Sequence, residues 1–99
     1  MTKFSNDLTD AQLERLAILS EEMGEAQQAI GKILRHGYHS WNPTVAHTRT
    51  NRDDLARELG HVHFAIDMLS HSDDVDADQV SFSYVEKEKS IKKWLHHQS

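Results

Sequence analysis

A long run of regularly spaced apolar residues between Thr9 and His36 constrains the fold of this chain more than any other feature. The apolar side chains recur at steps of three and four residues: Leu13, Leu16, Leu19, Met23, Ala26, Ile30, Ile33 and Leu34. At about 3.6 residues per turn, these positions form one stripe along a helix. Thr9 and Gln12 form a capping box at the start, and Gly37 follows the end at a left-handed cap position. The pattern predicts one helix over residues 9–36.

Two further helices are predicted after this one. Residues 51–70 carry a second apolar stripe and begin at Asn51, a residue type that caps helix N-termini. Residues 77–97 form the third helix, although residues 80–84 alternate with the period of a short strand. The segment 37–50 contains the only proline and is predicted to be a loop. We therefore predict an all-α fold, an antiparallel bundle of three helices.

The length of 99 residues corresponds to a single domain covering residues 1–99. A chain of this size buries only about 60–65% of the surface that its unfolded form exposes, so its own core is marginal. Burying a helix face against a second copy is a common remedy. We therefore expect a homodimer or a homotetramer.

The composition limits the partners and the compartment. Sixteen acidic residues against 11 basic ones give a net charge of −5, which argues against a nucleic-acid or membrane-surface partner. The chain has no cysteine, which excludes disulfides and thiolate metal sites. Residues 1–7 have no apolar run typical of a signal peptide, and no stretch approaches the ~18 apolar residues of a membrane span. We therefore expect a cytoplasmic protein. The acidic charge also means that, if the protein handles phosphates, it usually needs a cation as an intermediary.

Two glutamates on the first predicted helix differ from an ordinary solvated face. Glu22 and Glu25 are three residues apart, so they occupy neighbouring positions on one face of the helix, where like charges repel. Ile18 and Ala29 lie on the same face, which indicates that this face meets another element. Two carboxylates in such a place need a cation.

The second predicted helix supplies a matching set, because Asp54, Glu58 and His61 project together beside its apolar stripe. If the two helices pack antiparallel, Glu22 and Glu25 face Glu58 and His61 across a groove. Three carboxylates suit Mg²⁺ or Mn²⁺ that also carries waters and bound phosphates. The alternative is that these glutamates form a solvated acidic face.

Two segments of the chain resemble a known superfamily. Residues 16–26, Leu-Ala-Ile-Leu-Ser-Glu-Glu-Met-Gly-Glu-Ala, and residues 55–62, Leu-Ala-Arg-Glu-Leu-Gly-His-Val, look like the all-α NTP pyrophosphohydrolases. That superfamily includes MazG, dimeric dUTPases, dCTP pyrophosphatases and phosphoribosyl-ATP pyrophosphohydrolase. Its pattern is Glu-x-x-Glu on one helix and Glu-x-x-Asp on the next, and the likeness covers roughly residues 13–70. The resemblance implies a single MazG-like domain.

The resemblance also implies roles for individual residues. Glu22, Glu25 and Glu58 would be metal ligands, and Glu21 would be a supporting carboxylate. The fourth position of the pattern, normally aspartate, is His61 here. Either Glu22 or Glu25 would serve as the catalytic base.

The histidine at position 61 leaves three interpretations open. Neutral imidazole is a poor ligand for Mg²⁺ and suits Mn²⁺, Zn²⁺ or Ni²⁺, so His61 would ligate a softer metal. Alternatively, Asp54, one turn before Glu58, supplies the missing oxygen. In the third interpretation the metal site is weakened and catalysis is lost.

The activity that the resemblance implies is hydrolysis of a nucleoside triphosphate to the monophosphate and pyrophosphate. Lys32 lies on the same side of its predicted helix as Glu25, so it is a candidate to bind the phosphates. Arg35, Arg49 and Arg52 near the loop are alternatives, and the other interpretation is that these are solvated surface cations. Trp41 or Tyr38 in the loop would stack on the base, or else Trp41 caps the core beneath the loop. The rival interpretations are a non-catalytic relative of this superfamily and a small acidic helical interaction module.

Overall fold

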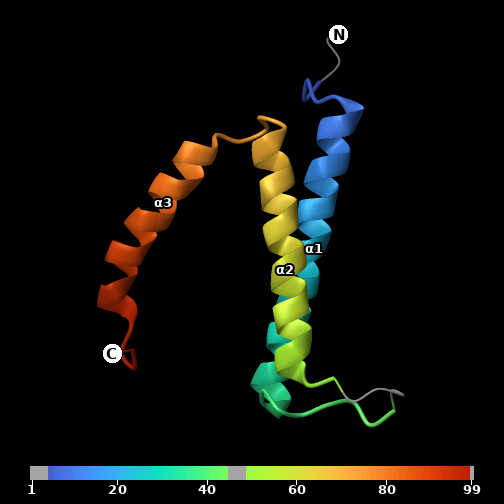
Figure 1. Ribbon diagram of the computed structural model, residues 1–99, viewed down its shortest axis with the longest axis vertical. Helices are drawn as coiled ribbons and strands as arrows, with labels where there is room; N and C mark the ends of the chain where they lie inside the picture. Colours follow the sequence, from blue (N-terminus) through green and yellow to red (C-terminus); the bar gives the residue numbers. More distant parts are fainter. Residues whose placement is uncertain (1–4, 45–48, 99) are drawn as a thin grey trace.

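All regular secondary structure in the computed structural model, which describes residues 5–44 and 49–98, is helical (Figure 1). The helices are α1 (Asp10–His36), α2 (Asn51–His71) and α3 (Ala77–Ser90), followed by the short 3₁₀ helix η1 (Ile91–Trp94). The all-helical prediction with three main helices is confirmed, and the limits of α1 and α2 agree with it to within one residue. Within the described residues, no helix is long and apolar enough to cross a membrane.

The third helix differs from the prediction in length and in packing. It ends at Ser90 and tightens into η1 up to Trp94, so the predicted end at residue 97 is wrong. A 3₁₀ turn is common at the end of an α-helix, particularly where no neighbouring element holds the last turn. Residues 80–84 are helical rather than a strand. α3 also stands away from α1 and α2, so one chain alone forms a two-helix hairpin with a separate third helix (Figure 1).

α1 and α2 pack side by side in antiparallel directions, and small side chains make their contact close (Figure 1). The buried apolar side chains of the described residues are Ala26 and Ala29 of α1, and Ala65 and Leu69 of α2. Alanine places only a methyl group between two helices, so their backbones approach closely. Much of the predicted α1 stripe remains outside this contact, with exposures between 40% and 82% for Leu13, Leu16, Met23, Ile30 and Leu34.

The N-terminus of α2 is capped by Thr50, so the prediction of Asn51 as the cap is wrong by one residue. The Thr50 hydroxyl accepts from the Asp53 N–H at 3.2 Å, and the Thr50 N–H donates to the Asp53 carboxylate at 3.3 Å. This reciprocal pair needs a side-chain oxygen acceptor three residues after the cap, and Asp53 supplies it for Thr50. Asn51 is instead buried, and its side-chain amide donates to the carbonyl of Gly37 at 3.1 Å.

The first residues of the loop tie the end of α1 to the start of α2. Gly37 ends α1 with φ +88° and ψ 168°, a positive φ that favours glycine but not the left-handed helical conformation that was predicted. The carbonyls of Tyr38 and Ser40 accept the N–H groups of Arg52 and Asn51 at 2.9 and 2.8 Å. These bonds satisfy N–H groups that the first turn of any helix leaves free. The loop therefore starts at a defined position beside both helices.

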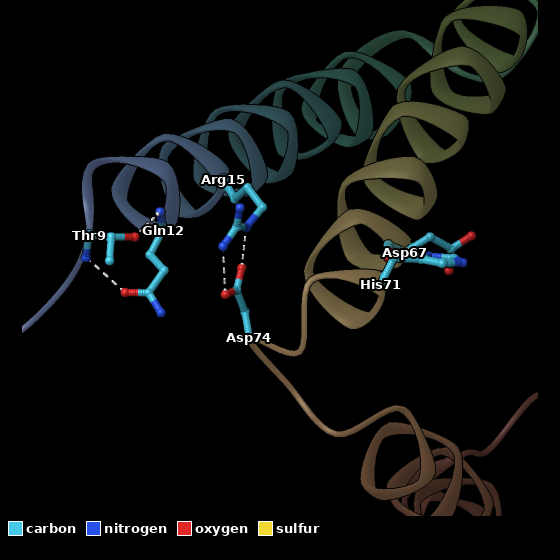
Figure 2. A network of polar contacts seen from close by, with 6 residues as sticks. All are labelled: Thr9, Gln12, Arg15, Asp67, His71 and Asp74. Atoms are coloured by element: carbon cyan, nitrogen blue, oxygen red, sulfur yellow. Dashed lines mark hydrogen bonds and ion pairs between the residues drawn. The ribbon is translucent and has the colours of Figure 1, made fainter.

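An ion pair holds the turn between α2 and α3 against α1 (Figure 2). The Arg15 guanidinium donates to both carboxylate oxygens of Asp74, at 2.5 and 2.9 Å. The Arg15 guanidinium lowers the pKa of the Asp74 carboxyl, chiefly through this hydrogen bond. The same hydrogen bond with Asp74 raises the pKa of Arg15. Asp73 in the same turn has φ +58° and forms no ion pair within the described residues, and Asp76 caps α3.

Replacing Asp74 by asparagine is expected to lower the Tm at pH 7, because it removes one partner of a bidentate ion pair. Asp73→Asn is the matched control, since asparagine also tolerates a positive φ. The contribution of Asp74 is present above the ordinary aspartate pKa of 3.8 and is lost as the pH falls through its lowered pKa. Thermal unfolding should therefore show a Tm difference between wild type and Asp74→Asn that shrinks below that pH. Equal Tm values for the two variants at pH 7 would refute the role of the ion pair.

Candidate metal centre

The antiparallel packing of α1 and α2 brings four side chains with metal-ligating atoms together. Glu22 and Glu25 come from one turn of α1, and Glu58 and His61 come from one turn of α2. One ligand atom from each of the four lies within 4.8 Å of the others, and all four residues are partly buried or at the margin of exposure. This is the juxtaposition that the spacing of the two helices predicted.

Two carboxylate oxygens in this cluster are buried without a hydrogen-bond partner. These are Oε2 of Glu22 and Oε2 of Glu58, whose side chains are only 22% and 13% exposed. Nδ1 of His61 lies 3.4 and 3.5 Å from the same two oxygens. A buried carboxylate oxygen without a donor costs free energy, so this place favours a positive charge. A cation coordinated by the oxygens, or a protonated His61, would supply it.

The pKa of Glu25 also reflects the crowding of carboxylates. A side-chain hydrogen bond with Glu58 raises the pKa of Glu25 above its usual value, and the charge of Glu22 raises it further. The raised pKa favours the protonated form of Glu25, so a divalent cation that binds this carboxylate would compete with the proton.

The alanines of the hairpin explain why these carboxylates face one another. Ala29 lies one turn beyond Glu25 on α1, and Ala65 lies one turn beyond His61 on α2, and both are buried in the contact between the helices. Residues four apart lie on the same face of a helix, so the groups one turn away are held opposite each other. Glu21 is exposed and lies outside the cluster, from where its charge contributes to the raised pKa of Glu25.

Asp54, the alternative ligand predicted from the sequence, lies outside the cluster of four. Its Oδ1 is 3.2 Å from Nε of Arg49, and this ion pair lies at the start of α2, next to the loop. Asp54 lines the groove that leaves the metal centre, and the structure brings His61 rather than Asp54 to the fourth position.

A groove runs from the candidate metal centre towards the loop. Its inner part has a volume of about 290 Å³ and is lined by Glu25 and Glu58 together with Lys32 and Arg57. Its outer part has a volume of about 600 Å³ and shares Lys32 and Arg57 with the inner part. The two substrate-binding candidates from the sequence that remain, Arg35 and Trp41, line this outer part. The structure thus places Lys32, Arg35 and Trp41 along one continuous path.

The groove has more positive charge than the composition of the chain indicates. Among the described residues, Arg49 is the groove cation with a carboxylate partner, while Lys32, Arg35 and Arg57 form no ion pair. Sequence reasoning missed Arg57, although it directly precedes Glu58 and lies three residues after Asp54 on the same helix. That spacing was the available signal that it points towards the groove.

Comparisons of the chain with protein-family models, with curated proteins and with solved structures gave no match. What the protein does must therefore be inferred from its own residues and their geometry. A cluster of three carboxylates and one imidazole is able to hold a divalent cation, and the cationic groove beside it is able to bind an anion.

Divalent cations are expected to bind this cluster and to raise the Tm, because they stabilise the folded chain in which the cluster exists. Glu58→Gln removes a proposed direct ligand of the metal. It should weaken metal binding by at least roughly 10–100-fold, which is the cost of changing a residue that only hydrogen-bonds to a ligand. Isothermal titration with Mn²⁺ measures the affinity, and Glu14→Gln, which removes an exposed carboxylate of α1, is the control.

The metal-free protein should show the opposite dependence on pH from that of the Asp74 ion pair. Because the pKa of Glu25 is raised in the fold, its contribution to stability is full at low pH and is lost as the pH rises through that raised value. The rise in Tm caused by Mn²⁺ should therefore grow with pH. A rise that is independent of pH, or unchanged by Glu58→Gln, would place the bound metal elsewhere.

Proposed function

We propose that this protein is a metal-dependent nucleoside triphosphate pyrophosphohydrolase of the MazG-like class. It hydrolyses a nucleoside or deoxynucleoside triphosphate to the monophosphate and pyrophosphate. The observation that carries the proposal is the cluster in which Oε2 of Glu22 and Oε2 of Glu58 are buried without a partner beside Glu25 and His61. The resemblance of residues 13–70 to this class supports it.

In this proposal Glu22, Glu25, Glu58 and His61 hold the divalent cation, which is Mg²⁺ or Mn²⁺. Their ligand atoms are close enough to share one ion. The imidazole favours Mn²⁺ over Mg²⁺, because Mg²⁺ prefers oxygen ligands alone. The bound cation neutralises phosphate charge and lowers the pKa of a water molecule at the site.

Of the two glutamates of α1, Glu25 is better placed to act as the base. It lines the inner groove, whereas the free oxygen of Glu22 is buried next to His61. Its pKa is raised, and a base is most effective when its pKa lies near the working pH. Glu25 accepts the proton of the attacking water, the water oxygen bonds to the α-phosphorus, and the bond between that phosphorus and the bridging oxygen breaks. Pyrophosphate leaves with the bridging oxygen.

The groove supplies the substrate contacts in this proposal. A triphosphate carries about four negative charges, and the acidic cluster alone would repel it. Lys32 and Arg57 lie in the inner groove next to the cluster and bind the phosphates, while Arg35 extends the positive charge outwards. Trp41, which is 54% exposed, stacks on the base, a contact worth about 1–3 kcal/mol.

We infer further that the active protein is a homo-oligomer, a dimer or a tetramer. The hairpin of α1 and α2 leaves most of the α1 apolar stripe exposed, and α3 buries no side chain. Soluble single chains rarely expose contiguous apolar surface on this scale.

The central experiment is pyrophosphate release from a panel of NTPs and dNTPs, with Mn²⁺ and separately with Mg²⁺. We expect release with at least one pair, and we expect Glu22→Gln and Glu58→Gln each to abolish it while Glu14→Gln keeps it. Absence of release with every pair, while Mn²⁺ still binds, would identify a non-catalytic relative, the candidate that a histidine in place of the family aspartate favours. Absence of both activity and metal binding would leave a helical interaction module.

His61→Asp tests which metal the fourth ligand selects. An aspartate would complete an all-oxygen ligand set, so activity with Mg²⁺ should rise relative to activity with Mn²⁺. His63→Asp is the control, because that side chain is 80% exposed and lies two residues away, on another face of α2. The ratio of the two activities is the quantity to measure, and a fall in activity with both metals would mean that His61 has a separate role.

A further inference from the structure

α3 has few contacts with the other described residues of its own chain. It buries no side chain, and its main contacts are with the η1 turn that follows it. Only its first turns, at Ala77, Val80 and Ser81, line a shallow pocket with the end of α2. Four of its apolar side chains are between 42% and 72% exposed: Val80, Phe82, Tyr84 and Val85. Isolated helices of this length are marginal in water, so packing by another element has to stabilise α3.

The total surface of the chain has the size expected for one half of a dimer. The accessible surface is 8584 Å², whereas a compact monomer of 11.4 kDa exposes about 5800 Å². The radius of gyration is 17.8 Å, against about 13 Å for a compact domain of 99 residues. Stable obligate dimers bury about 2000–5000 Å² in total, or about half of that on each copy. The excess surface of roughly 2800 Å² is sufficient for such an interface.

The turn before α3 holds the helix away from its own hairpin. Asp74 is fixed to Arg15 of α1 by two hydrogen bonds (Figure 2). Its N–H donates to the carbonyl of Leu69 at 2.9 Å. Asp76 then caps α3 by accepting from the Asp78 N–H at 2.9 Å. With both ends of the turn fixed, α3 diverges from α2 as it leaves the turn (Figure 1).

α1 carries a shallow groove that is mainly apolar and open to solvent. It has a volume of about 500 Å³ and is lined by Leu16, Leu19, Ser20, Met23, Gly24 and Gln27. A side chain added at Gly24 would meet no atom within 4 Å, so the chain itself does not fill this space. Met23 follows Glu22 directly, which rotates it by about 100° around the helix. The groove is therefore on a different side of α1 from the candidate metal centre.

Charge favours contact between α3 and a hairpin over contact between two hairpins. Residues 77–98 carry four lysines and three acidic residues, a net charge of +1, and the remaining residues carry −6. Two hairpins placed face to face would repel each other, whereas the region of α3 and η1 is attracted to a hairpin. Its lysines are Lys87, Lys89, Lys92 and Lys93.

We propose that two copies of this chain form a dimer by exchanging their third helices. α3 of each copy packs its apolar side chains into the groove of the partner's α1, and the contact is repeated by the two-fold symmetry of the pair. Both copies keep their own metal centre, since the groove and the centre lie on different sides of α1. The dimer does not depend on the catalytic proposal.

Light scattering of the full chain at micromolar concentration tests the dimer. We expect about twice the monomer mass of 11.4 kDa. Tyr84→Glu should raise the dissociation constant at least tenfold, because it places a charge in the apolar contact. Ser83→Glu adds the same charge at the residue directly before Tyr84, on a polar side of α3. This variant should remain dimeric. A wild-type chain that is monomeric throughout would overturn the proposal.

Cross-linking tests the exchange, and the absence of cysteine from the chain makes it unambiguous. Chains carrying Met23→Cys are mixed with chains carrying Tyr84→Cys, allowed to re-equilibrate and treated with a short bismaleimide. Exchange predicts covalent dimers that contain one chain of each kind. The double variant should likewise cross-link between chains. A bond within one chain would show that α3 folds back on its own hairpin, and bonds only between two Met23→Cys chains would show a dimer of hairpins. Either result would overturn the exchange, and circular dichroism verifies that each variant is folded.

Discussion

The close contact between α1 and α2 through small side chains is the constraint on which the rest of the structure depends. Ala26, Ala29 and Ala65 allow the two helices to approach, and that approach forces Glu22, Glu25 and Glu58 into one small volume. Packing and electrostatics therefore oppose each other, because every step that closes the hairpin brings like charges together in a partly buried place. The repulsion raises the pKa of Glu25, and a divalent cation bound between the carboxylates would relieve it. Metal binding and the packing of the hairpin are consequently linked, since whatever binds the closed arrangement stabilises it.

The distribution of charge matters more for the proposed chemistry than the net charge does. A protein of net charge −5 repels a triphosphate at long range. The groove reverses this locally, because Lys32, Arg35 and Arg57 have no ion-pair partner within the described residues, while the carboxylates beside them form the candidate metal centre. Asp54 neutralises Arg49 rather than joining the metal cluster, so the two zones remain separate. A ligand that carries both a bound metal and free phosphate charge fits the acidic cluster and the cationic groove together. A simple anion or a simple cation fits only one of the two.

The parts of the fold that follow from local periodicity were predictable from the sequence, and the parts that follow from tertiary contacts were not. The limits of α1 and α2 and the meeting of Glu22 with Glu58 follow from residue spacing and antiparallel packing. The cap at Thr50 was missed because the buried amide of Asn51 bonds to Gly37, fourteen residues away. The length of α3 was overestimated because apolar spacing continues past Ser90 while no neighbouring element holds the helix there. Arg57 was overlooked because its place three residues after Asp54 indicates only a shared helix face, and the groove on that face is a tertiary feature.

The apolar groove and the candidate metal centre lie on two different sides of α1. The side towards α2 holds the ligands and buries little apolar surface, only alanines and one leucine among the described residues of the hairpin. Such a core contributes little hydrophobic free energy, at about 25 cal/mol for each Å² buried. The outer side carries the larger side chains, Leu16, Met23 and Ile30, and gains free energy only when another chain covers it. In the proposed dimer, association would therefore stabilise the hairpin, and with it the geometry of the candidate metal centre, even though Glu22, Glu25, Glu58 and His61 all come from one chain. Conditions that separate the copies would then loosen the contact of α1 with α2 before they change any residue of the site.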